Sequence, residues 1–214
     1  QNFETPLLLA HARKVSMLLM DSDLEVRLAA IETLSGLEPH ALEPYAAALA
    51  GCVADPNEKA QVKALNALRH IGPHVLERHL PLIVMTLKET LCHPLVKSCC
   101  LDCMQDLPGS QVLAPHAALI AKLCRDEALA MSYQNLATIH AALKLFEKLP
   151  LSLQLEHVHA IQAILQLDVR ALINQRYADV VSKHAERIME QLFAPGGPGF
   201  LQAQADFQSR SRDA

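Results

Sequence analysis

Four of the six cysteines lie close together in the chain and are the first candidates for chemistry. Cys100 and Cys103 form a C-x-x-C pair, Cys99 lies beside them, and Cys92 lies seven residues before Cys99. A structural zinc site requires four sulfur or nitrogen ligands that converge, commonly from two well-separated pairs. This chain offers one crowded group on a single expected helix, so we interpret the cluster as buried packing. Metal binding or redox use stays the alternative.

Histidine is also abundant, with eleven residues, and could supply metal ligands. His70 and His74 are close in sequence, but Gly72-Pro73 separates their expected helices. A ring recurs instead at one spacing, at the positions His11, Tyr45, His79 and His116. A ring that recurs in this way indicates a packing or half-exposed spacer position rather than a ligand.

Other signatures of catalysis or cofactor binding are missing from the sequence. It contains no Ser/His/Asp spacing, no phosphate-binding glycine loop and no H-E-x-x-H motif. Gly196-Gly197-Pro198-Gly199 follows an expected helix rather than a strand, so it is typical of a linker. We therefore predict no enzyme activity, no catalytic residue, no resident metal and no cofactor.

The elements that must position these residues repeat along the chain. An offset of 34 residues pairs Asp21 with Asp55 and Leu34 with Leu68, and it also pairs the segments 37–44 and 71–78. Equivalent leucines follow at positions 8, 42, 76, 113 and 155, as the period lengthens from 34 to 37 and then to 42. A repeat of this length predicts stacked supersecondary units, each of which packs on its neighbours.

Hydrophobic periodicity predicts that each unit is a pair of helices. Turn residues such as Asp21-Ser22-Asp23, Asp55-Pro56-Asn57 and His93-Pro94 separate the helices and supply N-caps. The expected helices span residues 6–20, 24–37, 42–53, 58–71, 75–91, 95–107, 112–123, 133–149, 153–167 and 168–193. The fold class is therefore all-α, with residues 1–194 forming the solenoid and residues 195–214 a Pro/Gly break with a flexible polar tail.

Composition agrees with a helical repeat and excludes several classes of protein. The 214 residues are 51% hydrophobic but only 4% aromatic, and the formal net charge of −4 comes from interspersed charges. Without a clustered basic face, we expect no nucleic-acid partner. The apolar runs are far shorter than the roughly 20 residues of a transmembrane helix, so we expect no membrane insertion.

The segment 21–34 carries a resemblance to a known family, because it reads DSDLEVRLAAIETL. This string resembles the turn and second helix of a HEAT repeat, whose pattern is Asp-Pro-Asp-x-x-Val-Arg-x-x-Ala-x-x-x-Leu. Asp55-Pro56-Asn57 repeats the turn, and Val96-Lys97 repeats the Val-cation pair. The chain thus resembles the ARM/HEAT-like superfamily, which implies a right-handed α-solenoid of about five antiparallel helix pairs. Missing Trp and Tyr landmarks disfavour tetratricopeptide repeats, and short loops disfavour armadillo repeats.

The resemblance also implies a ladder of charged contacts between units. In HEAT repeats the Arg at the position of Arg27 contacts the turn Asp of an adjacent unit. The implied ladder comprises Asp21, Arg27, Asp55, Gln61 and Lys97. Gln61 stands where a cation is expected, which weakens one contact. Alignment by the Val-cation pairs also places Cys99 and Cys100 at the positions of Ala29 and Ala30, which supports the packing interpretation.

In HEAT solenoids the second helices line the concave face. The residues of that row that we expect to bind a partner are Lys59, Lys63, Asn66, Lys97 and Asp102. This mixture is modestly basic and suits a polar or acidic protein surface. An ordinary solvated face is the alternative, because scattered charges are normal on exposed helices.

These observations favour a non-catalytic scaffold or adaptor that offers an extended surface to protein partners in a larger chain or assembly. A HEAT-like enzyme, such as a bilin lyase or a metal-dependent hydroxylase, is an alternative, although His-Glu pairs are absent. A tubulin- or nucleic-acid-binding HEAT module is another. The apolar start of the chain, which begins at Gln1, favours a segment of a longer solenoid. Free thiols favour an intracellular location, the cytoplasm ahead of an organelle interior.

Overall fold

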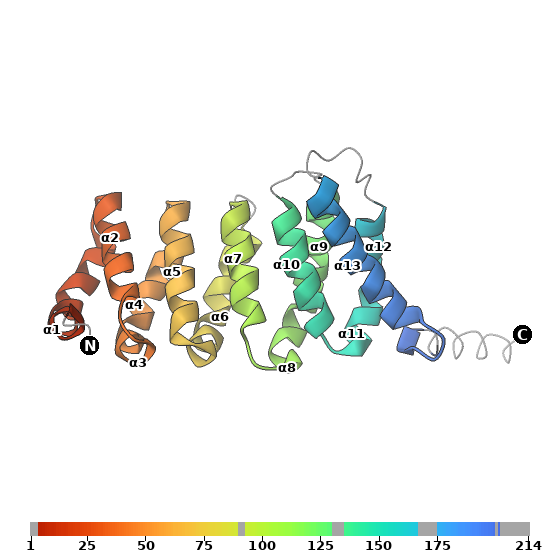
Figure 1. The fold of residues 1–214 in the computed structure, drawn as a ribbon, viewed down its shortest axis with the longest axis horizontal. Coiled ribbons are helices and arrows are strands. Elements are labelled where there is room, and N and C mark those ends of the chain that lie inside the picture. Colours follow the sequence, from red (N-terminus) through yellow and green to blue (C-terminus); the bar gives the residue numbers. More distant parts are fainter. Residues whose placement is uncertain (1–3, 90–92, 130–134, 167–174, 200, 202–214) are drawn as a thin grey trace, which may run out of the picture. The chain divides into compact units, whose positions relative to one another are not determined.

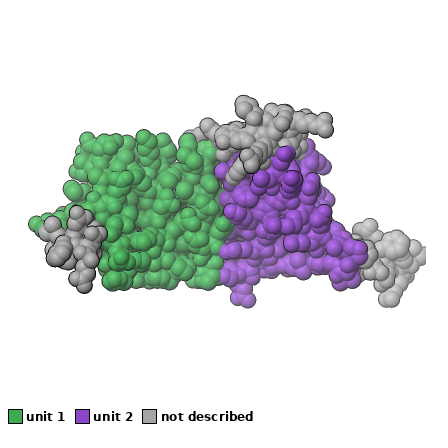
Figure 2. Space-filling view, in the orientation of Figure 1, with its two compact units in different colours: residues 1–108 green, residues 109–214 purple. Residues whose placement is uncertain are grey.

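The computed structural model describes residues 4–89, 93–129, 135–166, 175–199 and 201. These residues form helices and turns, and no strand occurs among them, which confirms the expectation of an all-α chain. The chain divides into two compact units, Gln1–Pro108 (unit 1) and Gly109–Ala214 (unit 2), coloured green and purple in Figure 2. Residues 202–214, which include most of the expected tail, lie outside the described part.

Unit 1 is built from helices of two layers. In chain order its elements are α1 (Glu4–Met17), η1 (Leu18–Met20), α2 (Leu24–Ser35), α3 (Pro39–Leu42), η2 (Glu43–Tyr45), α4 (Ala46–Gly51), η3 (Cys52–Ala54), α5 (Glu58–Ile71), α6 (Pro73–Lys88) and α7 (Pro94–Gln105). Helices α2, α5 and α7 lie side by side (Figure 1), with α2 against α5 and α5 against α7. Behind them, α4 contacts α5, and α6 contacts both α5 and α7. Each helix is therefore covered by elements that are near it in sequence.

The turns that precede α2, α5 and α7 each supply an N-cap. Asp23 Oδ1 accepts a hydrogen bond of 2.7 Å from the N–H of Glu25. Asn57 Oδ1 accepts one of 2.9 Å from the N–H of Lys59. His93 Nδ1 accepts the N–H of Leu95 at 3.3 Å. Each cap satisfies a helical N–H that has no partner within the helix, which fixes where the three layer helices begin.

Equivalent positions of successive repeats are buried in the core of unit 1. Ala30, Ala64 and Cys100 occupy equivalent places on α2, α5 and α7, and all three are buried. Leu34, Leu68 and Met104 are likewise buried at the next equivalent place. The small side chains let neighbouring helices approach closely, while the large ones fill the space between them. Hydrophobic periodicity predicts that Ala29 faces inward with Ala30, but Ala29 is exposed, so the inward face of α2 is narrower than its apolar sequence indicates.

The first helices of the hairpins are less regular than the periodicity predicts. The expected helix 42–53 is divided into α3, η2, α4 and η3. Pro44 lies in η2, where its missing N–H and its ring disfavour a continuous α-helix. Pro81 in contrast is accommodated inside α6. The sequence pattern therefore located this hydrophobic segment correctly but missed its interruption.

Unit 2 contains α8 (Ser110–Leu113), η4 (Ala114–His116), α9 (Ala117–Leu129), α10 (Asn135–Lys148), α11 (Leu151–Glu156), α12 (His159–Leu165) and α13 (Gln175–Phe193). Helix α9 contacts α10 and α12, and α13 also contacts α10 and α12. The expected single helix 153–167 is divided instead, because α11 ends at Glu156 and α12 begins at His159. The expected start of the last helix at Asp168 lies outside the described residues.

The Pro/Gly segment ends α13 by a close turn. Gly196 has a φ of 83°, a conformation that favours glycine, and the N–H of Gly197 donates to the carbonyl of Ala194 at 2.7 Å. A Cβ on Gly199 would lie 2.8 Å from the carbonyl oxygen of Leu192 and 2.9 Å from Leu155 Cδ2. The segment thus packs back on unit 2 near α11, where no larger residue fits without a shift.

Candidate functional site

Arg27 and Asp55 form the charged contact that the HEAT resemblance implies. Arg27 Nε donates to Asp55 Oδ2 at 2.7 Å, and Nη2 donates to Oδ1 at 3.1 Å. Nη1 of the same guanidinium donates to the carbonyls of Asp21 at 2.9 Å and Ser22 at 3.1 Å. One side chain on α2 therefore joins its own turn to the turn that precedes α5, with the bidentate geometry that arginine favours.

The Arg27–Asp55 contact keeps both charges. Burial alone would raise the pKa of Asp55, but hydrogen bonds from Arg27 and from the N–H of Asn57 bring that pKa below its usual value. The hydrogen bond to Asp55 raises the pKa of Arg27 in turn. A carboxylate held ionised in this way is a poor general acid or base near neutral pH. The pair is suited to fixing the turns rather than to proton transfer.

Gln61 occupies the position on α5 that Arg27 occupies on α2. Gln61 is half-buried and makes no side-chain hydrogen bond to any described residue. It lines a hollow of about 410 Å³ together with Asp55, Glu58 and Glu89. Lys97, at the equivalent place on α7, is half-buried. The amide at position 61 cannot supply the charged guanidinium that Arg27 supplies one unit earlier.

Two of the five expected partner-binding residues lie in one groove. Lys63 and Asn66 of α5 line a groove of about 520 Å³ between α2 and α5. The other lining residues are Ile31, Glu32, Ser35, Gly36, Ala67 and His70. Asn66 is exposed, so its amide can donate and accept hydrogen bonds at this surface. Lys59, Lys97 and Asp102 do not line the groove.

The charges of this face are more balanced than the sequence indicates. Lys63 forms an ion pair with Glu32 across the groove. Asp102 Oδ2 lies 3.9 Å from Arg69 Nη1, and Arg69 Nε donates to Asp106 Oδ2 at 2.7 Å. Acidic and basic groups of neighbouring helices thus neutralise each other in part. Among the five expected residues, Lys59 offers an exposed positive charge.

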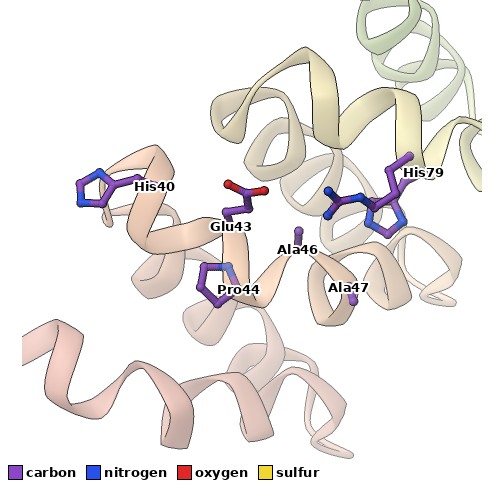
Figure 3. Close-up of a pocket in the computed structure, with 7 residues that line it drawn as sticks. His40, Glu43, Pro44, Ala46, Ala47 and His79 are labelled. Atoms are coloured by element: carbon purple, nitrogen blue, oxygen red, sulfur yellow. The ribbon is translucent and has the colours of Figure 1, made fainter.

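A second groove lies between η2–α4 and α6 (Figure 3) and encloses about 470 Å³. Its lining residues are His40, Glu43, Pro44, Ala46, Ala47, Arg78 and His79. Burial lowers the pKa of His79, and the charge of Arg78 lowers it further. Glu43 Oε1 lies 3.1 Å from His74 Nε2, while the ring of His40 points away from Glu43 in Figure 3. The titratable groups therefore do not converge on one point where a substrate or metal could react.

Most of the described cysteines are packed as small apolar residues: Cys52, Cys100, Cys103 and Cys124 are buried, whereas Cys99 is half-buried. Cys100 and Cys103 are fully buried, and Cys103 Sγ lies 3.8 Å from the carbonyl oxygen of Leu65. Burial raises the pKa of Cys103, and it raises that of Cys124 to about 12. Thiols of this kind carry little thiolate, the form that binds metals and reacts. Cys92 lies outside the described residues.

Two further observations concern metals and membranes. Within residues 4–89, 93–129, 135–166 and 175–199, no three His, Cys, Asp or Glu side chains are grouped so that they could hold a metal ion. No helix in the described part of the chain is long and apolar enough to cross a bilayer.

Of the ring positions that recur in sequence, His11 is exposed, whereas Tyr45, His79 and His116 are half-buried, as expected for a half-exposed spacer position.

A charged cluster in unit 2 was missed by the sequence reasoning. Glu147 of α10 lies between two basic side chains of α13: its Oε1 accepts a hydrogen bond of 2.7 Å from Arg187 Nη2, and its Oε2 lies 2.9 Å from His184 Nε2. The ring of His140 packs edge-on against that of His184. The available signal was spacing, since His140 and Glu147 lie two helical turns apart, and His184 and Arg187 lie one turn apart.

Comparison of the chain with protein-family models, with curated proteins and with solved structures finds no match.

Proposed function

We propose that the chain is a HEAT-like, right-handed α-solenoid of about five antiparallel helix pairs that serves as a non-catalytic scaffold or adaptor. Three features of unit 1 support this proposal: the 34-residue spacing of equivalent buried positions, the consecutive packing of α2, α5 and α7, and the Arg27–Asp55 contact between successive turns. Repeats of this kind provide a large surface relative to their mass.

The groove between α2 and α5 is the observation that carries the proposed binding role. It presents the exposed amide of Asn66 and the Glu32–Lys63 ion pair above the buried side chain of Ile31. Polar groups above an apolar floor are typical of surfaces that bind a protein segment. Lys59, at the start of α5, adds a positive charge that favours a partner with polar and acidic residues.

The same features argue against other classes. Two basic residues of α5, Lys63 and Arg69, are paired with acidic residues of neighbouring elements, whereas a nucleic-acid partner would need an excess of basic groups. Buried free thiols with raised pKa values support a reducing compartment inside the cell. We therefore propose protein partners, within a larger chain or assembly.

Site-specific photo-crosslinking tests the proposed surface. A photoreactive phenylalanine analogue at Asn66 samples the groove, and the same analogue at Met85, an exposed residue of α6, serves as the matched control. In extracts of the native cells, we expect Asn66 to crosslink to a protein that Met85 does not capture, and Lys59→Glu to weaken that capture. Equal labelling from both sites, or labelling that Lys59→Glu does not change, would contradict the proposed face.

A further inference from the structure

The contact between α10 and α13 brings two histidine rings together next to one carboxylate. The ring centroids of His140 and His184 lie 5.3 Å apart in an edge-on arrangement with an interplanar angle of 69°. His184 is buried and His140 is half-buried. The carboxylate of Glu147 lies 2.9 Å from His184 Nε2 and binds Arg187 at 2.7 Å. These four residues are called the histidine latch below.

The latch contains more basic than acidic groups. Among the described residues, the charges of Lys144, His184 and Glu147 act on His140. Other charged or titratable residues with described side chains on the helices that pack here, α9, α10, α12 and α13, are Lys122, Cys124, Arg125, Lys148, His159, Asp179, Lys183, Glu186 and Glu190. The carboxylate of Glu147 can offset one positive charge, and this carboxylate is already bound by Arg187. Protonation of both rings would place two cations in contact with each other, beside a carboxylate that Arg187 also binds, and like charges at this distance repel each other.

We propose that the histidine latch makes the docking of α13 on α10 dependent on pH, so that the helix is held near neutral pH and released as the solution becomes mildly acidic. Histidine is the side chain whose charge changes in this range. Two rings in contact across a helix interface convert that change into repulsion between the helices that carry them.

The sign of the proton linkage agrees with this mechanism. Burial lowers the pKa of His140, and Lys144 and His184 lower it further, while Glu147 opposes them. The released state therefore binds a proton more readily than the docked state. The stabilisation from the neutral ring is present above the ordinary pKa of about 6.5 and is lost as the pH falls below that value and through the lowered pKa of the docked ring. The pKa of Glu147 is also lowered, so its own contribution is lost only at more acidic pH.

Release would uncover an apolar face. Val181, Ala185, Ile188 and Leu192 follow helical spacing on α13, and each is at most 1% exposed in the docked state. The acidic form would therefore present an amphipathic helix whose apolar stripe is hidden at neutral pH. This consequence gives the latch a second observable besides the mobility of α13.

Hydrogen exchange measured at pH 7.5 and 5.5 tests the latch in the intact chain, with rates corrected for the intrinsic effect of pH on exchange. We expect protection of α13 to fall several-fold at pH 5.5, because the released state takes up a proton more readily than the docked state. Binding of a hydrophobic dye should rise over the same range. In His140→Phe, which keeps an aromatic ring without a titrating group, both changes should disappear.

His159→Phe is the matched control. The rings of His157 and His159 also meet edge-on, with centroids 6.1 Å apart, but His159 is exposed on α12. This variant should respond to pH as the unmodified chain does. If His140→Phe already loses protection at pH 7.5, His184→Phe removes the other ring and provides the same test. Protection of α13 that does not change with pH, or a change that both ring variants retain, would overturn the proposal.

Discussion

Each unit contains a charged contact between neighbouring helix pairs, and the chemistry of this contact differs between the two units. In unit 1, Arg27 and Asp55 bind each other through two hydrogen bonds, and the side chain of Asp55 is only 5% exposed. In unit 2, the carboxylate of Glu147 contacts both His184 and Arg187, and the Arg187 side chain is 57% exposed. The first contact consists of groups that are ionised throughout the neutral range, whereas the second includes imidazole rings, the type of side chain that serves as a pH switch in proteins.

This difference indicates that two units built from packed helices can differ in how their stability depends on pH. The lowered pKa of Asp55 means that its contribution to folding stability is present above about pH 4 and is lost only as the pH falls through the lowered value. Unit 1 should therefore keep its contact under conditions in which the histidine latch of unit 2 loosens. The fixed contact suits a framework, and the titrating contact suits a regulated surface.

The largest expected loss of stability comes from a substitution in the apolar core of unit 2. Phe146 is fully buried on α10, next to Glu147 in sequence. Phe146→Ala should lower the free energy of unfolding by about 3–5 kcal/mol, because it removes buried surface and leaves a cavity. Urea denaturation measures this loss. A reduction below about 1 kcal/mol would mean that charged contacts, rather than the apolar core, dominate the stability of unit 2.

Removal of the fixed contact should come next. Arg27→Met deletes the guanidinium and leaves the buried carboxylate of Asp55 without its partner, so the urea midpoint should fall clearly. The fall should be present at both pH 7.5 and pH 5.5, because the contacts of Asp55 in the unmodified chain lower its pKa and keep it ionised at both values. The double variant Arg27→Met/Asp55→Asn serves as the control and should recover part of the loss. A fall that depends strongly on pH in this range would contradict the contrast between the units.

The turn before α5 allows a smaller test that is independent of charge. Asn57→Ala removes the side chain that caps the N–H of Lys59 and should cost about 1 kcal/mol, as the loss of an N-cap does. Thermal unfolding of this variant can be compared with that of Asn57→Asp, which keeps an acceptor oxygen and should cost little. Equal losses in both variants would indicate that Asn57 acts through something other than its capping oxygen.

The smallest effect should come from the ion pair in the α2–α5 groove. Lys63 and Glu32 are partly exposed, with side-chain accessibilities of 35% and 64%. Lys63→Met should therefore change the free energy of unfolding by less than about 1 kcal/mol. Urea denaturation at low and at high salt measures it. A large, salt-insensitive loss would show that this pair supports the fold as Arg27–Asp55 does.

Sequence repetition predicted much of unit 1 because the same local rules operate in each hairpin. The 34-residue offset placed Leu34 and Leu68 at equivalent positions, and both are buried. The turn residues Asp23 and Asn57 were identified as cap candidates, and each accepts a backbone N–H of the following helix. Helix caps and hydrophobic periodicity are encoded within a few residues, so a single sequence is enough to reveal them.

Contacts between helices were less accessible to this reasoning. Lys63 looked like a free positive charge, but its partner Glu32 lies 31 residues away in sequence. The histidine latch joins Glu147 to Arg187, 40 residues apart, and nothing local to either residue indicates their meeting. Pro44 was visible in the sequence, but periodicity alone did not show that it would divide a helix that Pro81 does not divide in α6. Such features depend on which faces meet in three dimensions.

Double-mutant cycles on both contacts, each measured at pH 7.5 and 5.5, test the contrast between the units most directly. One cycle combines Arg27→Met with Asp55→Asn, and the other combines His140→Phe with His184→Phe. We predict that the coupling between Arg27 and Asp55 is favourable and equal at both values of pH, whereas the coupling between the two histidines becomes unfavourable at pH 5.5. A histidine coupling that stays unchanged on acidification, or an Arg27–Asp55 coupling that vanishes at pH 5.5, would contradict the account.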